Sequence, residues 1–316
     1  MLEVLAQRNF PMESLKLLAS GRSAGKQMEF NGKSYTIEEL THDSFKDVDI
    51  ALFSAGGGRS KEFGPSAVKA GAVVVDNSSA FRMDPNTPLV VPEVNPEAIK
   101  QHKGIIANPN CSTIIMNVAV WPLYQKNKVT RVIASTYQAA SGAGATAMEE
   151  LETQARDWVA GKPLTQEFWG RQYMWNVFSH NSDIDPSNGY CEEEIKMTNE
   201  TRKIFNDPNI GVAATCIRVP VLRAHCEALT LEFENPITPD EARAILRDAP
   251  GVDVVDDIAA NKFPEPLDVS GKDNCAVGRI RVDLSNPSGK GLCLYVSGDQ
   301  LLKGAALNAV QIAELL

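Results

Sequence analysis

Cys111 is the residue of this sequence best placed to form a covalent bond with a substrate. It follows the turn Asn108-Pro-Asn and leads into an apolar stretch, residues 113–123, that is predicted to be a helix. Asn110 or Ser112 would cap that helix, which leaves Cys111 among the unpaired N–H groups of its first turn. Such a position stabilises a thiolate and lowers the thiol pKa below its unperturbed value of about 8.5. The alternative is a small buried cysteine, the usual fate of a lone cysteine.

A nucleophilic thiol needs a base, and the chain has only four histidines: His42, His102, His180 and His225. The first two lie among charged, turn-like residues and are predicted to be at the surface. His180 is predicted to cap a loop. His225 comes just before a predicted strand and shares a face of that strand with apolar residues. From the residues alone, a hydrogen-bonded core histidine is therefore the simpler interpretation of His225.

Several charged side chains could bind an anionic substrate. Arg82 and Lys196 are candidate anion anchors, and Arg218 could hold a carboxylate through two parallel hydrogen bonds. Glu193 lies three residues before Lys196, in Cys191-Glu-Glu-Glu-Ile-Lys. Taken one at a time, each is more simply explained as a solvated surface charge.

Four short apolar runs in the first third of the chain predict strands at 15–20, 48–54, 71–76 and 104–108. Helical segments such as 60–70 lie between some of them, and this alternation indicates a parallel sheet buried on both faces. Ligands of such sheets bind at the carboxyl ends of the strands. Three of these ends are rich in Gly and Ser, which suits a phosphate-bearing ligand: Ser20-Gly-Arg-Ser-Ala-Gly, Ser54-Ala-Gly-Gly-Gly and Asp76-Asn-Ser-Ser-Ala-Phe-Arg.

A dinucleotide-binding sheet begins with a strand and a Gly-rich turn that leads into a helix. This chain begins inside what is predicted to be that helix, residues 2–8, and no GxGxxG precedes it. We therefore expect an incomplete Rossmann-type domain that lacks one strand and one loop through truncation, roughly 10–15 residues on typical element lengths. A Rossmann-like domain that never had the loop is the alternative.

The second part of the chain is richer in strands, predicted at 129–137, 212–219, 228–234, 278–283 and 291–296. A helical, Trp-bearing insertion is predicted from 145 to about 175, and a closing helix over 303–316 is expected to cover the first sheet. The expected fold class is α/β, an incomplete parallel-sheet domain followed by an α+β catalytic and dimerisation domain. The predicted boundaries are 1–112 with 300–316 for the first domain and 113–299 for the second.

The composition excludes several classes of protein. The net charge is −9, and there is no Lys/Arg block to bind nucleic acid. No segment approaches the roughly 20 apolar residues of a membrane span. The N-terminus has neither a signal-peptide nor a transit-peptide pattern. Six cysteines without CxxC spacing argue against a metal site or a disulfide scaffold, and favour a reducing compartment.

Together these segments resemble the aspartate-semialdehyde dehydrogenase family, particularly its plant and bacterial branches. The resemblance runs along nearly the whole chain. Its most specific pieces are Ser54-Ala-Gly-Gly, Asp76-Asn-Ser-Ser-Ala-Phe-Arg, Asn108-Pro-Asn-Cys-Ser-Thr, Tyr137-Gln-Ala-Ala-Ser-Gly-Ala-Gly and Arg218-Val-Pro-Val.

The resemblance implies a role for each catalytic candidate. Cys111 would attack the semialdehyde carbon to give a thiohemiacetal, hydride would leave to the nicotinamide, and phosphate would release the resulting thioester as aspartyl phosphate; biosynthesis runs the reverse. His225 would be the acid/base, with a pKa near the working pH. Gln138 would orient the substrate, and Asn110 would help to stabilise the oxyanion.

The resemblance also implies the substrate contacts. Arg218 would bind the substrate carboxylate and Glu193 its amine. Arg82 and Lys196 would bind the phosphate. The substrate would thus be a small molecule, aspartate semialdehyde or aspartyl phosphate with inorganic phosphate.

The cofactor implied by the resemblance is NADP, because an arginine stands where NAD-specific sheets have an acidic residue. Gln300 stands where many members of the family have Asn. The expected cofactor contacts are Ser20, Arg22, Ser23, Ser54, Gly56, Gly57, Ser141, Gly142 and Gln300.

The family's reaction serves the biosynthesis of Lys (by way of diaminopimelate), Thr, Met and Ile. A homodimer is implied, with a tetramer as the alternative, in the cytoplasm or, for a photosynthetic eukaryote, the plastid stroma. Three rival functions stay open: another phosphorylating aldehyde dehydrogenase such as acetylglutamyl-phosphate reductase or the glyceraldehyde-3-phosphate enzyme, a papain-like cysteine hydrolase, and an inactive truncated remnant.

Overall fold

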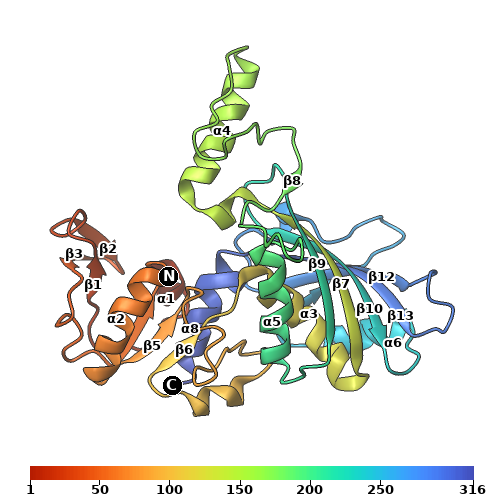
Figure 1. Ribbon diagram of the computed structural model, residues 1–316, viewed down its shortest axis with the longest axis horizontal. Helices are drawn as coiled ribbons and strands as arrows, with labels where there is room; N and C mark the ends of the chain where they lie inside the picture. Colours follow the sequence, from red (N-terminus) through yellow and green to blue (C-terminus); the bar gives the residue numbers. More distant parts are fainter. The chain divides into compact units, whose positions relative to one another are not determined.

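The computed structural model describes residues 1–316 and divides them into two compact units. Unit 1 comprises Met1–Pro109 and Ala305–Leu316, and unit 2 comprises Asn110–Gly304 (Figure 1). The domain boundaries predicted at 112/113 and 299/300 therefore lie at 109/110 and 304/305 in the structure. Cys111 belongs to unit 2, because the helix that starts there packs on the sheet and helices of that unit.

Unit 1 holds two three-stranded sheets. The first is parallel, in the order β4-β5-β6, with bounds Ile50–Phe53, Val73–Asp76 and Ile105–Ala107. The second has the order β1-β3-β2, with bounds Leu17–Ala19, Lys33–Glu39 and Gln27–Phe30. The four predicted strands all form, but the prediction that they share one parallel sheet is wrong for β1.

A hairpin that we did not predict explains the position of β1. The strands β2 and β3 are joined at Asn31-Gly32, whose φ angles of 49° and 73° are both positive. Asn-Gly with two positive φ angles is the signature of a two-residue hairpin turn. Strand β1 pairs in parallel with β3 of this hairpin and not with β4. Residues of both β1 and β4 line a cavity of about 1690 Å³.

The helices of unit 1 are α1 (Leu2–Gln7), α2 (Gly57–Lys69), the 3₁₀ helix η1 (Pro96–Gln101) and α8 (Leu307–Glu314). A short π-helix, η3 (Leu302–Ala306), leads into α8. Ala309 and Ile312 of α8 pack against Val75 and Ile106 of the parallel sheet. The prediction that the closing helix covers the first sheet is therefore confirmed.

Unit 2 is built on a seven-stranded sheet in the order β11-β12-β13-β10-β7-β9-β8. All neighbours are antiparallel except β7 with β9 and β11 with β12. In sheet order the strands are Val252–Val254, Cys275–Val282, Gly291–Gly298, His225–Phe233, Val129–Gln138, Gly211–Arg218 and Phe178–Ser179. The five predicted strands are present, and the short edge strands β8 and β11 are additions.

The helices of unit 2 are η2 (Ala140–Ala143) and α3 (Cys111–Lys126), α4 (Ala145–Val159), α5 (Glu192–Ile204), α6 (Pro239–Arg247) and α7 (Pro266–Val269). Helix α5 was not predicted, although its sequence carries the signals. Cys191 and Glu194 form a capping box, acidic residues fill the first turn, and basic residues occupy the last. None of the helices is both long and apolar enough to cross a lipid bilayer.

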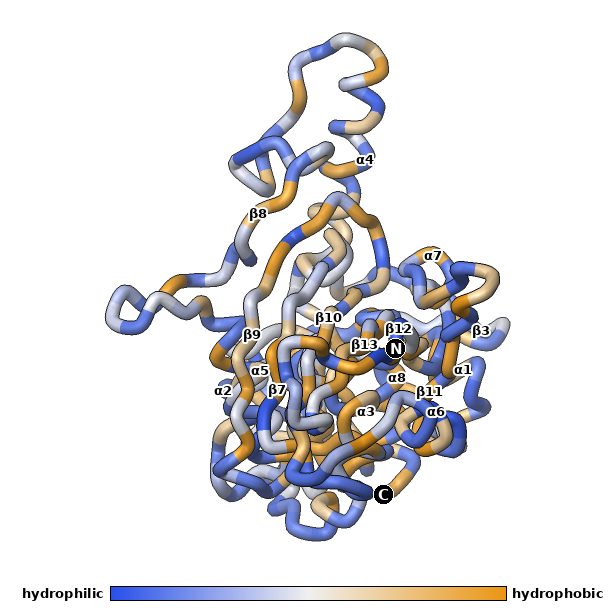
Figure 2. Tube along the Cα trace, turned by 90° about the vertical axis from the view of Figure 1, so that its right-hand side faces the viewer, coloured by the Kyte–Doolittle hydropathy of each residue, from blue (hydrophilic) through white to orange (hydrophobic).

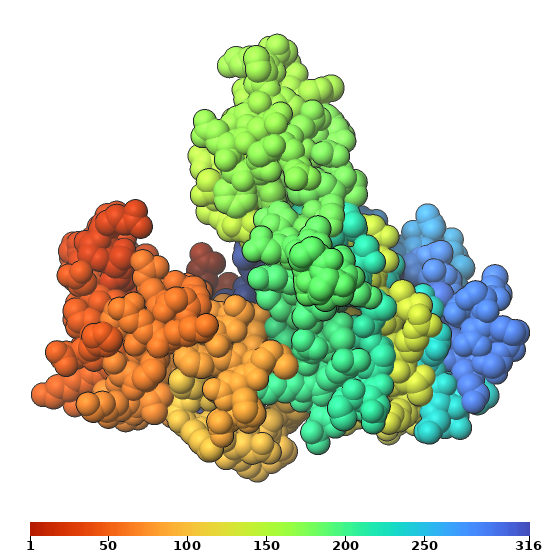
Figure 3. Space-filling model, viewed as in Figure 1, coloured from red at the N-terminus to blue at the C-terminus, as the bar shows by residue number.

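The insertion that begins at Ala145 stands away from the sheet of unit 2 (Figure 1, Figure 3). Only residues 145–159 are helical, so the prediction of a helical segment to residue 175 is wrong beyond that point. Gly161, with a φ of 66°, and the following Pro163 end the helix. Buried Trp169 and Tyr173 hold the returning loop, while Trp158 at the end of α4 is exposed. The trace of this insertion, around the labels α4 and β8, contains both hydrophobic and hydrophilic segments (Figure 2).

Candidate active site

Cys111 is the first residue of α3, and Asn110 is its cap. The backbone of Asn110 is extended (φ −62°, ψ 144°), and its Oδ1 accepts a hydrogen bond from the Thr113 N–H at 3.1 Å. This decides the choice left open between Asn110 and Ser112. The Cys111 side chain is partly exposed and forms no disulfide. The N–H groups and the dipole of a helix start favour negative charge, so the position suits a thiolate.

Gly304 is a site residue that we did not single out from the sequence. A Cβ atom on Gly304 would lie 2.9 Å from the Cβ of Cys111 and 3.2 Å from that of Gln300. Only a residue without a side chain lets the backbone pass so close. The signal was present in the small residues of Lys303-Gly-Ala-Ala, which we assigned only to an apolar helix.

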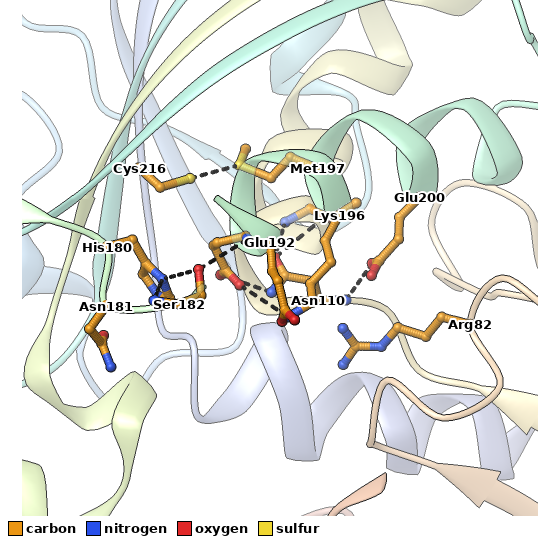
Figure 4. Close-up of polar contacts among 12 residues, drawn as sticks. Arg82, Asn110, His180, Asn181, Ser182, Glu192, Lys196, Met197, Glu200 and Cys216 are labelled. Carbon is orange, nitrogen blue, oxygen red and sulfur yellow. Dashed lines mark hydrogen bonds and ion pairs between the residues drawn. The ribbon is translucent and has the colours of Figure 1, made fainter. Parts of the chain in front are cut away.

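Glu193 joins two of the predicted catalytic residues. Its Oε1 accepts hydrogen bonds from Asn110 Nδ2 at 2.9 Å and from Gln138 Nε2 at 3.1 Å. Thr136 Oγ1 donates to Gln138 Oε1 at 3.0 Å and so fixes the orientation of that amide. The backbone N–H of Asn110 donates to Glu200 Oε2 at 2.6 Å (Figure 4). The cap of α3 is thus tied to α5 through two buried carboxylates.

The carboxylate of Glu193 is kept charged although it is buried. Burial raises its pKa, while the hydrogen bonds from Asn110 and Gln138 and the charge of Lys196 lower it, and the pKa lies below its ordinary value. Lys196 Nζ lies 3.9 Å from Glu193 Oε2 and 3.3 Å from Glu192 Oε2 (Figure 4). Lys196 is therefore not the isolated surface charge that its residue type suggested.

Arg218 ends β9 and is 3% exposed. Its Nη1 donates to the Ala139 carbonyl at 3.0 Å, its Nε to Asn181 Oδ1 at 3.1 Å and its Nη2 to His180 Nε2 at 2.8 Å. The guanidinium also lies 5.5 Å from the ring centre of Trp169. All these partners are neutral. Burial lowers the pKa of Arg218, yet a guanidinium stays charged, so this buried cation is suited to an anionic ligand.

His180 is more than the loop cap that we predicted. Because arginine only donates, the contact with Arg218 makes His180 Nε2 an acceptor, while Nδ1 faces the backbone N–H of Ser182 at 3.2 Å. Nδ1 lies 3.0 Å from Ser182 Oγ (Figure 4). Burial, followed by the charge of Arg218, lowers the pKa of His180 to about 4. A neutral His180 therefore orients Arg218 without adding charge.

His225 begins β10 and is 0% exposed. Its Nδ1 accepts a hydrogen bond from the Ala139 backbone N–H at 3.0 Å, whereas Nε2 has no partner among the protein groups. A core histidine, the simpler interpretation from the residues, would have both nitrogens satisfied. Burial, then the charge of Arg218, holds the pKa of His225 well below its ordinary value. This differs from the expected pKa near the working pH, because an enclosed site next to a cation disfavours imidazolium.

Ala139 and Gly142 hold His225 and Arg218 together. The N–H of Ala139 binds His225, and its carbonyl oxygen binds Arg218. A Cβ atom on Gly142 would lie 2.9 Å from His225 Nε2 and 3.2 Å from Arg218 Nη1. Gly142 was predicted as a cofactor contact; in the structure it is also the residue that leaves room beside the unpartnered nitrogen of His225.

Ser141 and Gln300, both predicted to contact the cofactor, are hydrogen-bonded to each other through Ser141 Oγ and Gln300 Nε2. Gln300 Oε1 accepts from the Ala224 N–H at 2.8 Å. Asp299, next to Gln300, forms an ion pair of 2.8 Å with Arg223. The Gln300 amide is therefore fixed on both sides within unit 2.

In unit 1, the cavity of about 1690 Å³ is lined by Ser20, Arg22 and Ser54 of the predicted cofactor set, and by Arg59, which we did not predict. Gly56 precedes α2 with a φ of 86°, and nothing lies within 4 Å of the place of its missing Cβ. The open start of α2 and the two arginines that line the cavity suit phosphate groups. These residues fit a dinucleotide.

The other predicted residues of unit 1 lie close by in the chain. Ser23 is in the turn after β1, and Gly57 is the first residue of α2. Arg82 donates from Nε to the Asn108 carbonyl at 2.9 Å and from Nη2 to the Asn77 carbonyl at 3.2 Å. These contacts anchor Arg82 at the carboxyl ends of β5 and β6. Its role toward phosphate stays a prediction.

Comparison with known proteins agrees with the two-unit division. Residues 1–102 match the family model "Semialdehyde dehydrogenase, NAD binding domain", and residues 120–303 match "Semialdehyde dehydrogenase, dimerisation domain". The aspartate-semialdehyde dehydrogenase of Synechocystis sp. is 55% identical over 100% of this chain and 93% of its own length. The chain belongs to the aspartate-semialdehyde dehydrogenase family.

Solved structures of the family extend the comparison to the fold. Aspartate-semialdehyde dehydrogenase II from Vibrio cholerae, complexed with ASA, matches with a TM-score of 0.95 and 45% identity over 100% of this chain and 93% of that one. The Candida albicans enzyme with NADP matches with a TM-score of 0.77 and 25% identity, over 100% and 94%. The cofactor of this family member is accordingly a nicotinamide dinucleotide, and unit 2 contains its dimerisation domain.

Membership of the aspartate-semialdehyde dehydrogenase family bears on the alternatives. It leaves no support for a papain-like hydrolase, and the matched relatives do not favour another phosphorylating aldehyde dehydrogenase. The expected loss of a strand and a Gly-rich loop is not confirmed by the comparisons.

Proposed function

We propose that the chain catalyses the NADP-dependent reductive dephosphorylation of aspartyl phosphate to aspartate semialdehyde, and its reverse, through a thioacyl intermediate on Cys111. The reaction serves the biosynthesis of Lys, Thr, Met and Ile. Arg218 is the observation that carries the proposal. A buried guanidinium with only neutral partners gains most from a ligand carboxylate, because such a ligand supplies the charge and the paired acceptors that the protein does not.

Glu193 supplies the opposite charge for the same ligand. Its carboxylate is kept ionised in a buried position, and its charge acts on Arg218. An α-amino acid carries a carboxylate and an ammonium group side by side, so it can satisfy Arg218 and Glu193 together. An acyl phosphate or aldehyde without an amino group would not supply the ammonium group that the Glu193 carboxylate is proposed to bind.

The covalent step takes place at the start of α3. The thiolate of Cys111 attacks the acyl carbon, a C–S bond forms, and the C–O bond to phosphate breaks, so phosphate leaves with the bonding electrons. Lys196 and Arg82 are proposed to bind that phosphate. The thioester that remains on Cys111 keeps the aspartyl chain on Arg218 and Glu193.

A bound nicotinamide dinucleotide supplies hydride in the biosynthetic direction and accepts it in the other. Addition of hydride makes the thioester carbon tetrahedral and places a negative charge on its oxygen. Because Nδ1 of His225 faces a backbone N–H, its proton is on Nε2, and the neutral ring can donate one hydrogen bond to that oxygen. Collapse of the alkoxide then breaks the C–S bond and returns the thiolate. No proton has to leave His225 in this sequence.

The preference for NADP over NAD rests on Arg22. It lines the cavity of unit 1 in the turn that follows β1, where a cation can bind a 2′-phosphate. Arg22→Ala should weaken NADP binding by roughly tenfold or more, as loss of a charged hydrogen bond implies, and leave NAD binding unchanged. Titration calorimetry with both dinucleotides measures this. An equal loss of affinity for NADP and NAD would show that Arg22 does not bind the 2′-phosphate.

We infer a homodimer formed through unit 2, and light scattering on the purified protein distinguishes it from a tetramer. A reducing cytoplasm suits a chain with six cysteines and no disulfide, and bacterial relatives are consistent with this compartment.

The decisive experiment is an assay in the oxidative direction. Aspartate semialdehyde, phosphate and NADP should give NADPH, and omission of phosphate should stop turnover after about one equivalent per site, with the thioester trapped on Cys111. Turnover of N-acetylglutamate semialdehyde in place of aspartate semialdehyde would overturn the substrate. Absence of both turnover and NADP binding would indicate an inactive remnant.

A further inference from the structure

Glu227 is a buried acid that the mechanism above does not use. It lies two residues after His225 on β10, is 0% exposed, and neither of its carboxyl oxygens has a hydrogen-bond partner in the protein. Its strand neighbours offer no donor. Val296 is apolar, and the hydroxyl of Thr136 already donates to Gln138.

The side chain of Glu227 faces α3. Gly298 of β13 is paired with His225, and a Cβ atom on Gly298 would lie 3.0 Å from Ile115 of α3. Directly paired residues share a face of the sheet, and so do residues two apart on a strand. Helix α3 packs on both β7 and β13, which flank β10 in the sheet. Glu227 therefore points into the layer between α3 and the sheet.

The first two turns of α3 bring further unsatisfied groups to the helix. Ser112 is next to Cys111 and is completely buried, and its Oγ has no hydrogen-bond partner in the protein. Asn117 is also completely buried and its Nδ2 has no partner, but its Oδ1 accepts from Thr201, so Asn117 lies on the side of α3 that faces α5. Leaving such groups unsatisfied costs about 1–3 kcal/mol each, so buried polar groups of this kind are normally bridged by internal water.

We propose that Glu227 is a neutral carboxylic acid that positions the first turns of α3, and with them Cys111, through internal water shared with Ser112 in the layer between α3 and the sheet. This deepens the proposed function and rests on it for the role of Cys111. The charge state follows from the surroundings. No cation pairs with Glu227, and burial, followed by the negative charge of Glu193, raises its pKa well above the ordinary value. Because Glu227 is neutral, it adds no second negative charge to that of the Cys111 thiolate, and it still has one O–H to donate.

Two readouts that need no turnover test the proposal. The infrared difference spectrum of the wild type minus Glu227→Gln should contain the carbonyl stretch of a protonated carboxylic acid at neutral pH. The rate at which iodoacetamide alkylates Cys111 should be nearly unchanged in Glu227→Gln, which keeps a neutral donor and acceptor. It should fall roughly fivefold to tenfold in Glu227→Leu, which leaves Ser112 on α3 without its bridge. Both rates are measured in a Cys293→Ser background, because Cys293 is the other partly exposed thiol.

Glu232→Gln is the matched control, since Glu232 lies on the same strand with its side chain on the opposite face and an ion pair to Arg131. It should change neither readout. A missing protonated band, or equal alkylation rates in the wild type and Glu227→Leu, would overturn the proposal. If Glu227→Leu does not fold, the infrared spectrum and the Glu227→Gln rate still decide, because a charged Glu227 would give no band and a changed rate. Failure of the aspartate-semialdehyde assay with both readouts as expected would count against the proposed function alone.

Discussion

Cys111 at the start of α3 and His225 at the start of β10 both take part in the proposed reaction, but their surroundings have opposite effects on charge. At the start of α3, Cys111 is partly exposed in the first turn of the helix, at the positive end of the helix dipole. At the start of β10, His225 is fully enclosed, faces a backbone N–H at Nδ1, and lies beside Arg218. The start of α3 favours the thiolate anion of Cys111, whereas the start of β10 disfavours the imidazolium cation of His225.

The difference separates this site from a cysteine–histidine ion pair. In a cysteine hydrolase the imidazole takes the thiol proton and stays charged next to the thiolate. Here the backbone N–H of Ala139 occupies the side of the ring on which imidazolium would need its second proton. The thiolate is therefore stabilised by the helix start and by the charge of Arg218, and His225 is left to donate a hydrogen bond to the substrate oxygen.

The largest expected effect comes from the helix start. Cys111→Ser should lower kcat by at least about 1000-fold, because a serine hydroxyl is not ionised there and no base is available to activate it. The oxidative assay measures it, with unchanged NADP binding as the test of folding. Cys293→Ser, at a partly exposed thiol on β13, should stay fully active. Appreciable activity in Cys111→Ser would mean that another residue carries the covalent step.

Arg218 is linked to both regions, because its charge acts on Cys111 and it shares Ala139 with His225, and its loss should be the next largest effect. Arg218→Lys keeps a positive charge but loses the planar set of donors that reaches Ala139, Asn181 and His180. We expect kcat/KM for aspartate semialdehyde to fall roughly 100-fold or more. Arg223→Lys, which affects an ion pair with Asp299 instead, should change it by less than about tenfold. Similar losses in both variants would contradict a carboxylate site at Arg218.

The helix start could be predicted because its signals are local. Asn-Pro-Asn before an apolar run determines the cap, and the structure places Asn110 and Cys111 as cap and first residue. The closing helix and most strands were predicted for the same reason, since burial and periodicity are properties of short segments. Helix α5 and the hairpin at Asn31-Gly32 also had local signals, which we overlooked.

The strand start could not be predicted from local signals. Whether His225 is neutral depends on Ala139, in the turn after β7 and far away in sequence, and on the direction in which the nearby Arg218 points from the end of β9. Strand alternation placed His225 on a buried face, but not the direction of its two nitrogens. The pairing of β1 with β3 failed for a related reason, because the partner of a strand is chosen by tertiary packing.

The neutral state of His225 can be tested by replacing it with another neutral donor. His225→Gln keeps an N–H and should retain kcat within about tenfold, whereas His225→Leu should lose roughly 100-fold, the usual cost of one oxyanion donor. Steady-state kcat across pH completes the test, since the wild-type profile should show no inflection from His225 near neutral pH. Equal loss in the two variants, or an inflection that disappears in His225→Gln, would restore an acid/base role and remove the contrast with Cys111.

The smallest expected effect is on stability in acid, and it extends the contrast to His180. Burial and Arg218 lower the pKa of His180 to about 4, below its unfolded value of about 6.5. Between these two values the unfolded chain binds a proton at His180 and the folded chain does not. The free energy of unfolding should therefore decrease as pH falls through this window, by up to about 1.4 kcal/mol per pH unit from this residue.

Urea unfolding at pH 6.5 and at pH 5, in the wild type and in His180→Gln, measures that contribution. Gln keeps an acceptor for Arg218 but does not titrate, so the difference between the two pH values should be smaller in the variant. His42→Gln, at the exposed surface, controls for the loss of one histidine. If the two pH values differ by the same free energy in His180→Gln and in the wild type, His180 is not held neutral. Arg218 would then lie next to a second cation, which the close contact between its guanidinium and His180 Nε2 makes energetically unfavourable.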